Sequence, residues 1–99
     1  MSSDLNEVVP LQAPTGLSAK GLPGAVNQIA FGGEGGDVRF EIWRRHGDTV
    51  DWYLHATTNE PNFDDSPVKP GQYYEYKVRS VRGELVSEFS PSAVVYGAA

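Results

Sequence analysis

The 99-residue chain carries 13 acidic and 8 basic residues, which gives a formal net charge of −5 at pH 7. Because nucleic-acid-binding domains usually present a basic face, this balance argues against a nucleic-acid partner. The chain has no cysteine, so neither a disulfide nor a thiolate metal site can form. Its length is that of one domain with its own hydrophobic core.

Residues 1–12 predict an extended N-terminal arm in front of a domain over residues 13–97. Val8 and Val9 followed by Pro10 favour an extended segment. A frayed terminus and an arm that docks on a neighbouring molecule both fit this pattern. The arm lacks the basic region and apolar core of a secretory signal, and no apolar run approaches the roughly 20 residues that span a membrane. We therefore expect no membrane partner, and release by lysis or assembly into a larger particle.

Alternation of apolar and polar residues with period two predicts β-strands separated by turns rich in glycine, proline and aspartate. No stretch has a sustained period of 3.6 residues, so no helix is expected. The pattern predicts an all-β fold, a seven-stranded antiparallel immunoglobulin-like sandwich. The predicted strand segments are residues 15–20, 26–31, 38–45, 50–57, the strand after Pro70-Gly71, and 85–96, which is broken near Ser90-Pro91.

The longest alternating segment follows the Pro70-Gly71 turn. Its predicted inner face carries Tyr74, Tyr76 and Val78, and its other face alternates in charge, which is typical of a central antiparallel strand. We expect it to pair with residues 38–45 on one side and 85–96 on the other. A buried Tyr74 needs a hydrogen-bond partner for its hydroxyl, and the backbone a few residues upstream can supply one.

Two further segments are interpreted as connections. Residues 58–67 predict an acidic, turn-rich loop with Phe63 as its core anchor. The glycine-rich run over 32–37 does not have phosphate-binding spacing and precedes no helix, so it predicts a flexible connection between strands.

The order of these segments resembles that of fibronectin type III domains, over roughly residues 13–96. This resemblance implies a sandwich fold in which Tyr74 forms the tyrosine corner. The chain departs from the family pattern at Phe31, which stands where the family usually has a core tryptophan. Within the family, the sequence is most similar to modules of bacteriophage tail and virion proteins and of secreted bacterial proteins. The matching stretches are Ala13–Leu17, Phe40–Arg44, Asn62–Asp65 with Val68–Tyr74, Tyr76–Val81 and Ser87–Pro91.

The sequence offers no residue set for catalysis, and we predict that the chain is not an enzyme. His46 and His55 are the only imidazoles, and their positions predict exposed surface histidines. Asp64 and Asp65, with Glu60 nearby, do not have the spacing of a calcium loop and predict a solvated acidic loop. We expect no catalytic residue, no metal site and no cofactor.

One sheet face is the candidate binding surface, because exposed tryptophan, tyrosine and arginine are enriched where partners bind. Three interpretations stay open: a polar face covered by its own side chains, a protein contact surface, or a sugar-stacking platform on Trp43. The candidate partner-binding residues are Arg39, Trp43, Arg45, Trp52, Tyr73, Lys77 and Arg79.

These features favour a non-enzymatic structural or protein-binding module. The concrete hypothesis is a small virion protein, a capsid decoration or tail accessory protein, that docks on a larger protein assembly. A homo-oligomer on that assembly is compatible with this hypothesis. The alternative is a carbohydrate- or cell-surface-binding module of a secreted bacterial protein, located outside the cell or on the bacterial surface.

Overall fold

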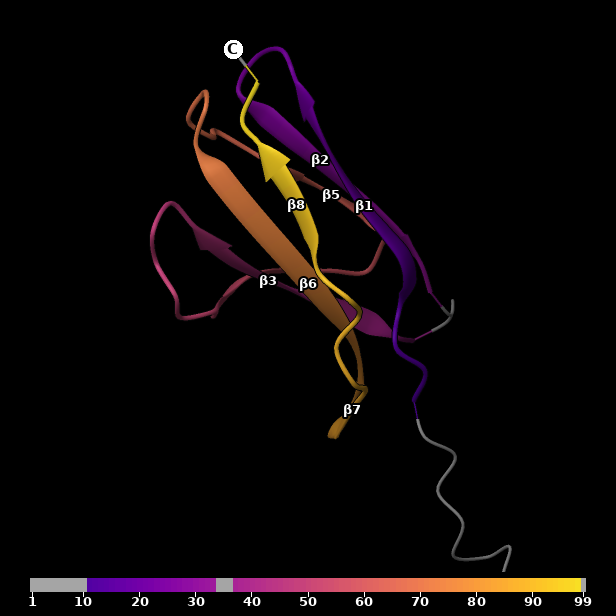
Figure 1. Ribbon diagram of the computed structural model, residues 1–99. Helices are drawn as coiled ribbons and strands as arrows, with labels where there is room; N and C mark the ends of the chain where they lie inside the picture. The colour runs from indigo at the N-terminus through magenta and orange to yellow at the C-terminus, as the bar shows by residue number, and fades with distance from the viewer. Residues whose placement is uncertain (1–10, 34–36, 99) are drawn as a thin grey trace, which may run out of the picture.

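The computed structural model describes residues 11–33 and 37–98, which form eight strands (Figure 1). No helix occurs in these ranges, and accordingly none that could cross a membrane. The strands are β1 (Thr15–Leu22), β2 (Val26–Gly32), β3 (Arg39–His46), β4 (Tyr53–Thr58), β5 (Asn62–Asp65), β6 (Tyr73–Arg82), β7 (Leu85–Val86) and β8 (Ala93–Tyr96).

The strands form two antiparallel sheets that pack face to face. One sheet has the order β1-β2-β5 and the other the order β4-β3-β6, with β7 and β8 both paired to the free side of β6. Figure 1 shows β6 as the long central strand, flanked by β3 and β8. The pairing that the sequence predicted for this strand is confirmed, and so is the all-β sandwich.

The prediction of a simple acidic loop over residues 58–67 was wrong. Residues Asn62–Asp65 form β5, which pairs with β2 and completes the smaller sheet. The turn residues on both sides concealed this four-residue strand. Strand β4 also begins at Tyr53 rather than Val50, because the chain is still turning there, with a hydrogen bond from Thr49 N to His46 O.

The break in the last segment has a hydrogen-bonding explanation. Between β7 and β8 the chain runs beside β6, where Ser87 Oγ accepts from Ser80 N at 2.8 Å and Ser90 Oγ accepts from Val78 N at 3.1 Å. Serine hydroxyls thus replace backbone carbonyls as acceptors for β6. Pro91 has no N–H to donate, which favours such an interruption.

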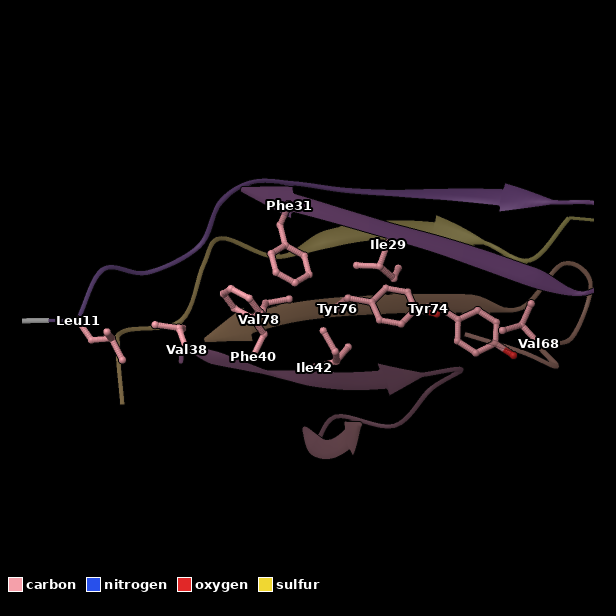
Figure 2. Close-up of a cluster of buried hydrophobic side chains, with 10 residues drawn as sticks. All are labelled: Leu11, Ile29, Phe31, Val38, Phe40, Ile42, Val68, Tyr74, Tyr76 and Val78. Carbon is pink, nitrogen blue, oxygen red and sulfur yellow. The ribbon is translucent and has the colours of Figure 1, made fainter. Parts of the chain in front are cut away.

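The core lies between the sheets and follows the predicted alternation (Figure 2). Phe31 and Phe40, one from each sheet, meet edge to face with ring centroids 4.9 Å apart. Leu11 packs at one end of this core beside Val38, so burial extends to the first described residue. Gln12 is described as well, and its carbonyl accepts from Ser80 Oγ at 2.8 Å. Residues 1–10 of the predicted arm lie outside the described residues. The buried cluster is Leu11, Ile29, Phe31, Val38, Phe40, Ile42, Val68, Tyr74, Tyr76 and Val78.

At the other end of the core, Tyr74 holds the turn that leads into β6. Its hydroxyl accepts a hydrogen bond from the Lys69 backbone N–H at 2.8 Å, and its side chain is buried. This contact is the upstream backbone partner that a buried tyrosine requires at a tyrosine corner.

Replacing Tyr74 by Phe is expected to lower the free energy of unfolding by about 1–2 kcal/mol, because the part-buried Lys69 N–H loses its acceptor. Urea denaturation followed by fluorescence measures this change. Tyr96→Phe is the matched control, since Tyr96 is 61% exposed. Equal stability of the two variants would contradict a structural role for the Tyr74 hydroxyl.

Candidate functional site

The structure gathers the predicted binding residues on the solvent side of the larger sheet, which we call the outer face. Residues directly opposite each other in an antiparallel pair point to the same side. Trp43 lies opposite Lys77 on β6 and Leu54 on β4, and Tyr73 lies opposite Tyr96 on β8. The outer face comprises Arg39, Glu41, Trp43, Arg45, Trp52, Leu54, Tyr73, Glu75, Lys77, Arg79, Phe89, Val94 and Tyr96.

Two carboxylates organise the charges of this face, and the first is Glu75. Its Oε1 accepts from Arg45 Nε at 2.8 Å and from the Tyr73 hydroxyl at 2.7 Å, while Ser92 Oγ donates to Oε2 at 2.6 Å. Burial alone would raise the pKa of Glu75, but these hydrogen bonds and the charge of Arg45 lower it below its ordinary value. Glu75 is therefore ionised and fully partnered.

Glu41 plays the same part at the other end of the face. Its Oε1 accepts from Trp43 Nε1 at 2.9 Å and from Arg79 Nε at 2.8 Å. Burial raises its pKa, and the hydrogen bonds from Trp43 and Arg79, with the charges of Arg79 and Arg39, outweigh that effect and lower it. The indole of Trp43 is thus fixed in orientation by a hydrogen bond.

Between these carboxylates, cations and aromatic rings alternate. Lys77 Nζ lies 4.5 Å from the centroid of Trp52 and 4.1 Å from that of Phe89. The Arg45 guanidinium is 4.6 Å from Trp52, and that of Arg79 is 4.9 Å from Phe89. Such contacts hold side chains in place, and Trp52, Lys77 and Phe89 are half-buried among them. The face is therefore ordered by its own side chains, and a partner would meet a prearranged surface.

Apolar side chains rim this ordered centre. Leu54 is 47% exposed, Val94 49% and Tyr96 61%, and they lie on the outer face over both of its flanking strands. Phe89, from the irregular stretch before β8, also contacts Trp43 edge to face at 5.6 Å. The sequence pattern did not predict Phe89, because the stretch around Pro91 does not alternate as a strand.

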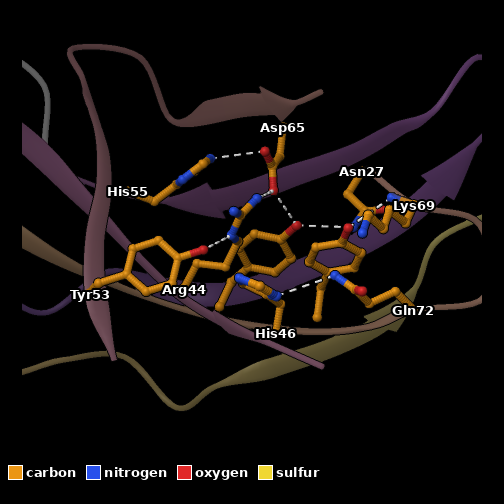
Figure 3. A network of polar contacts seen from close by, with 10 residues as sticks. Asn27, Arg44, His46, Tyr53, His55, Asp65, Lys69 and Gln72 are labelled. Atoms are coloured by element: carbon orange, nitrogen blue, oxygen red, sulfur yellow. Dashed lines mark hydrogen bonds and ion pairs between the residues drawn. The ribbon is translucent and has the colours of Figure 1, made fainter. Parts of the chain in front are cut away.

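A second polar cluster lies inside the protein and was not expected (Figure 3). Asp65, predicted to be solvated, is 2% exposed. Its Oδ2 accepts from Arg44 Nη1 at 2.7 Å and from the Tyr76 hydroxyl at 2.6 Å, and its Oδ1 lies 2.9 Å from His55 Nε2. Asp65 on β5 thereby joins its own sheet to three strands of the other. Only once residues 62–65 are known to form a strand does alternation from Phe63, an expected core anchor, place Asp65 inward.

The histidines are not the exposed surface residues that were expected. The His55 side chain is 23% exposed because it turns toward Asp65. His46 Nδ1 lies 3.2 Å from Gln72 Nε2, and its ring lies between those of Tyr53 and Tyr74. Over the described ranges, neither histidine is hydrogen-bonded to a serine hydroxyl, and no three His, Asp or Glu side chains cluster closely enough to hold a metal ion.

Hydrogen bonds within the buried cluster fix the protonation states of Asp65 and Tyr76. Burial by itself would raise the pKa of Asp65, but hydrogen bonds from His55, Tyr76 and Arg44 lower it to about 2. Burial and the hydrogen bond to Asp65 raise the pKa of Tyr76, whose hydroxyl also accepts from Asn27 Nδ2 at 2.9 Å. Tyr76 is thus a neutral donor and Asp65 a permanent anion near neutral pH.

Ionisation of Asp65 makes the free energy of unfolding depend on pH. Its folded pKa of about 2 lies below the ordinary value of 3.8, so its contribution is fully present above about pH 4 and is lost as the pH falls toward 2. The loss is expected to be about 2 kcal/mol. Urea denaturation at pH 6, 4, 3 and 2 measures it, with Asp65→Asn as reference. The two proteins should converge in stability toward pH 2, and a constant difference would contradict this assignment.

Comparison with solved structures identifies the architecture. No protein-family model matches the sequence, and no curated protein sequence matches it. An Fn3-like protein from Clostridium thermocellum superposes with a TM-score of 0.77 at 22% identity, over 92% of this chain and 97% of that one. The chain has the fibronectin type III fold. The fold by itself does not imply a function.

Regions with the same fold occur within much longer proteins. A structure of β-1,2-glucanase from Parabacteroides distasonis matches with a TM-score of 0.79 at 23% identity, over 94% of this chain and 13% of that one. A structure of titin kinase and its flanking domains matches with a TM-score of 0.75 at 9% identity, over 91% and 18%. The chain thus spans less than a fifth of these two proteins. At such identities the similarity concerns the fold alone.

Proposed function

We propose that this fibronectin type III domain is a non-enzymatic structural module that docks through its outer face on a larger protein assembly. The observation that carries the proposal is the composition of this face. Trp43, Trp52 and Tyr73 lie among ordered cations, and exposed Leu54 and Val94 rim them. Aromatic and arginine anchors surrounded by further contacts are the side chains that contribute most to protein interfaces.

The assembly that we propose is a virion, with the chain as a capsid decoration or tail accessory protein. Support comes from the sequence, which predicts a small acidic domain with a proline-containing arm and resembles modules of phage virion proteins. Mass spectrometry of purified virions tests this location. The chain should be present in stoichiometric amount, and its absence from the particles would refute the virion role without excluding another assembly.

A glycan-binding module of a secreted bacterial protein is the second candidate, and the tryptophans of the outer face favour it. Against it, the Trp43 ring already contacts the Arg79 guanidinium at 5.4 Å and Phe89 at its edge, which leaves less of its surface for a sugar. A glycan array distinguishes the candidates. Binding that Trp43→Ala abolishes would favour the sugar site, whereas no binding to any glycan supports the protein-docking proposal.

A further inference from the structure

The centre of the outer face holds a cation, Lys77. Lys77 Nζ stands between Trp52 and Phe89, with ring centroids 4.5 and 4.1 Å away. Over residues 11–33 and 37–98, Lys77 makes no ion pair and donates no side-chain hydrogen bond. An ammonium has three N–H donors, and the faces of two rings satisfy its charge only in part.

The neighbours of Lys77 on this face add positive charge. Desolvation by burial lowers the pKa of Lys77, and the charges of the flanking Arg45 and Arg79 lower it further, against the opposing effect of the Glu75 charge. The carboxylates of the outer face already pair with arginines, since Glu75 accepts from Arg45 and Glu41 accepts from Arg79. Arg39 also lies on this side of β3, opposite Val81. Four cations and two carboxylates on β3 and β6 thus make the outer face positive, in a chain whose net charge is −5.

We propose that the outer face binds an acidic segment of a partner protein, with a partner carboxylate on Lys77 and apolar partner side chains against Leu54 and Val94. This inference rests on the proposed docking function and names the chemistry of the partner. A carboxylate would accept the hydrogen bonds that Lys77 does not donate to the described part of its own chain, and it would lie between two guanidinium groups held at fixed positions.

A protein partner fits this surface better than a nucleic acid. The exposed apolar residues of the rim would be buried by apolar side chains of a partner. An acidic peptide with leucine or valine supplies such side chains, and a phosphate backbone does not. The net charge of −5 would also repel a polyanion at long range, whereas a short acidic segment meets mainly the positive face.

The experiment titrates the ¹⁵N-labelled domain with a synthetic peptide in which glutamates alternate with leucine and serine, and with the same peptide carrying glutamine for glutamate. We expect the acidic peptide, but not the glutamine peptide, to shift amide resonances of β3, β6 and β8. The affinity for the acidic peptide should fall as the salt concentration is raised. Lys77→Gln should weaken binding about tenfold and Lys77→Arg should largely restore it. Lys20→Gln on β1 is the matched control and should bind as wild type, with all variants checked for an unchanged melting temperature.

Three results of the peptide titration would overturn the inference: equal binding of the acidic and glutamine peptides, binding that Lys77→Gln leaves unchanged, or no binding of either peptide. Tighter binding of an oligothymidylate would overturn it in favour of a nucleic acid. Concentration-dependent sedimentation that Lys77→Gln abolishes, without peptide binding, would overturn it in favour of a second copy of this chain. If the domain still docks on its assembly through the outer face in any of these cases, only the acidic partner is refuted.

Discussion

Replacing Asp65 by Asn is expected to lower the free energy of unfolding by about 3 kcal/mol, the cost typical of breaking a buried ion pair from one side. The Arg44 side chain, 15% exposed, would lose the carboxylate at 2.7 Å that compensates its charge. The Tyr76 hydroxyl would face an amide in place of the anion that it now bonds at 2.6 Å. Because Asp65 joins β5 to the opposite sheet, the loss should loosen the contact between the sheets and not only one strand.

Urea denaturation at pH 7 measures this effect, and Asp64→Asn is its control. The two substitutions change net charge equally and lie next to each other on β5, but Asp64 is exposed. We expect the Asp64 variant to stay within about 0.5 kcal/mol of wild type. Similar losses for both variants would mean that net charge matters and the buried cluster does not.

Gly97→Ala is expected to lower the free energy of unfolding by about 2 kcal/mol, through overpacking. A Cβ at this position would overlap the Lys69 carbonyl oxygen and press on the backbone of Pro70. The φ angle of Gly97 lies outside the left-handed region, so the need for glycine is steric. Gly97 also forms two backbone hydrogen bonds with the turn before β6. Its N–H donates to Gln72 O at 3.0 Å, and its carbonyl accepts from Gly71 N at 2.8 Å.

The control for this prediction is Gly32→Ala at the end of β2. A Cβ there meets first the Thr15 hydroxyl, the end of a side chain that can turn away, and the φ angle is again not left-handed. Its cost should stay below about 1 kcal/mol. In addition, the Gly71 amide should lose protection from hydrogen exchange in Gly97→Ala but not in Gly32→Ala. Equal protection in both would contradict the proposed contact.

The sequence predicted the sandwich and its core because period-two alternation is strong wherever a strand has one buried face. Phe40 and Ile42 on β3, and Tyr76 and Val78 on β6, all point inward as that pattern requires. Strand β5 escaped notice because four residues between turn signals carry too little alternation to be distinguished from a loop. The need for glycine at position 97 left no local signal at all, since it depends on Lys69, which is distant in the sequence.

The outer face could be predicted in outline and not in detail. Alternation on two long neighbouring strands places Trp43, Lys77 and Arg79 on one side. The tertiary contacts of Phe89 depend on how the irregular stretch before β8 folds back on β6. The pairing of Glu41 with Arg79 and of Glu75 with Arg45 depends on the register of β3 against β6, which places each pair directly opposite. The buried position of Asp65 was hidden because charged residues are almost never fully buried unless paired, and its partners lie on three other strands.

The docking role of the outer face can be tested most directly by site-specific photo-crosslinking in the native assembly. A photoreactive phenylalanine analogue replaces Val94 on the outer face in one variant and Ala30, exposed on β2 of the other sheet, in a second. We expect a crosslink to one partner protein of defined mass from position 94 and none from position 30. Crosslinks from position 30 alone, or from neither position in assemblies that contain the protein, would contradict it.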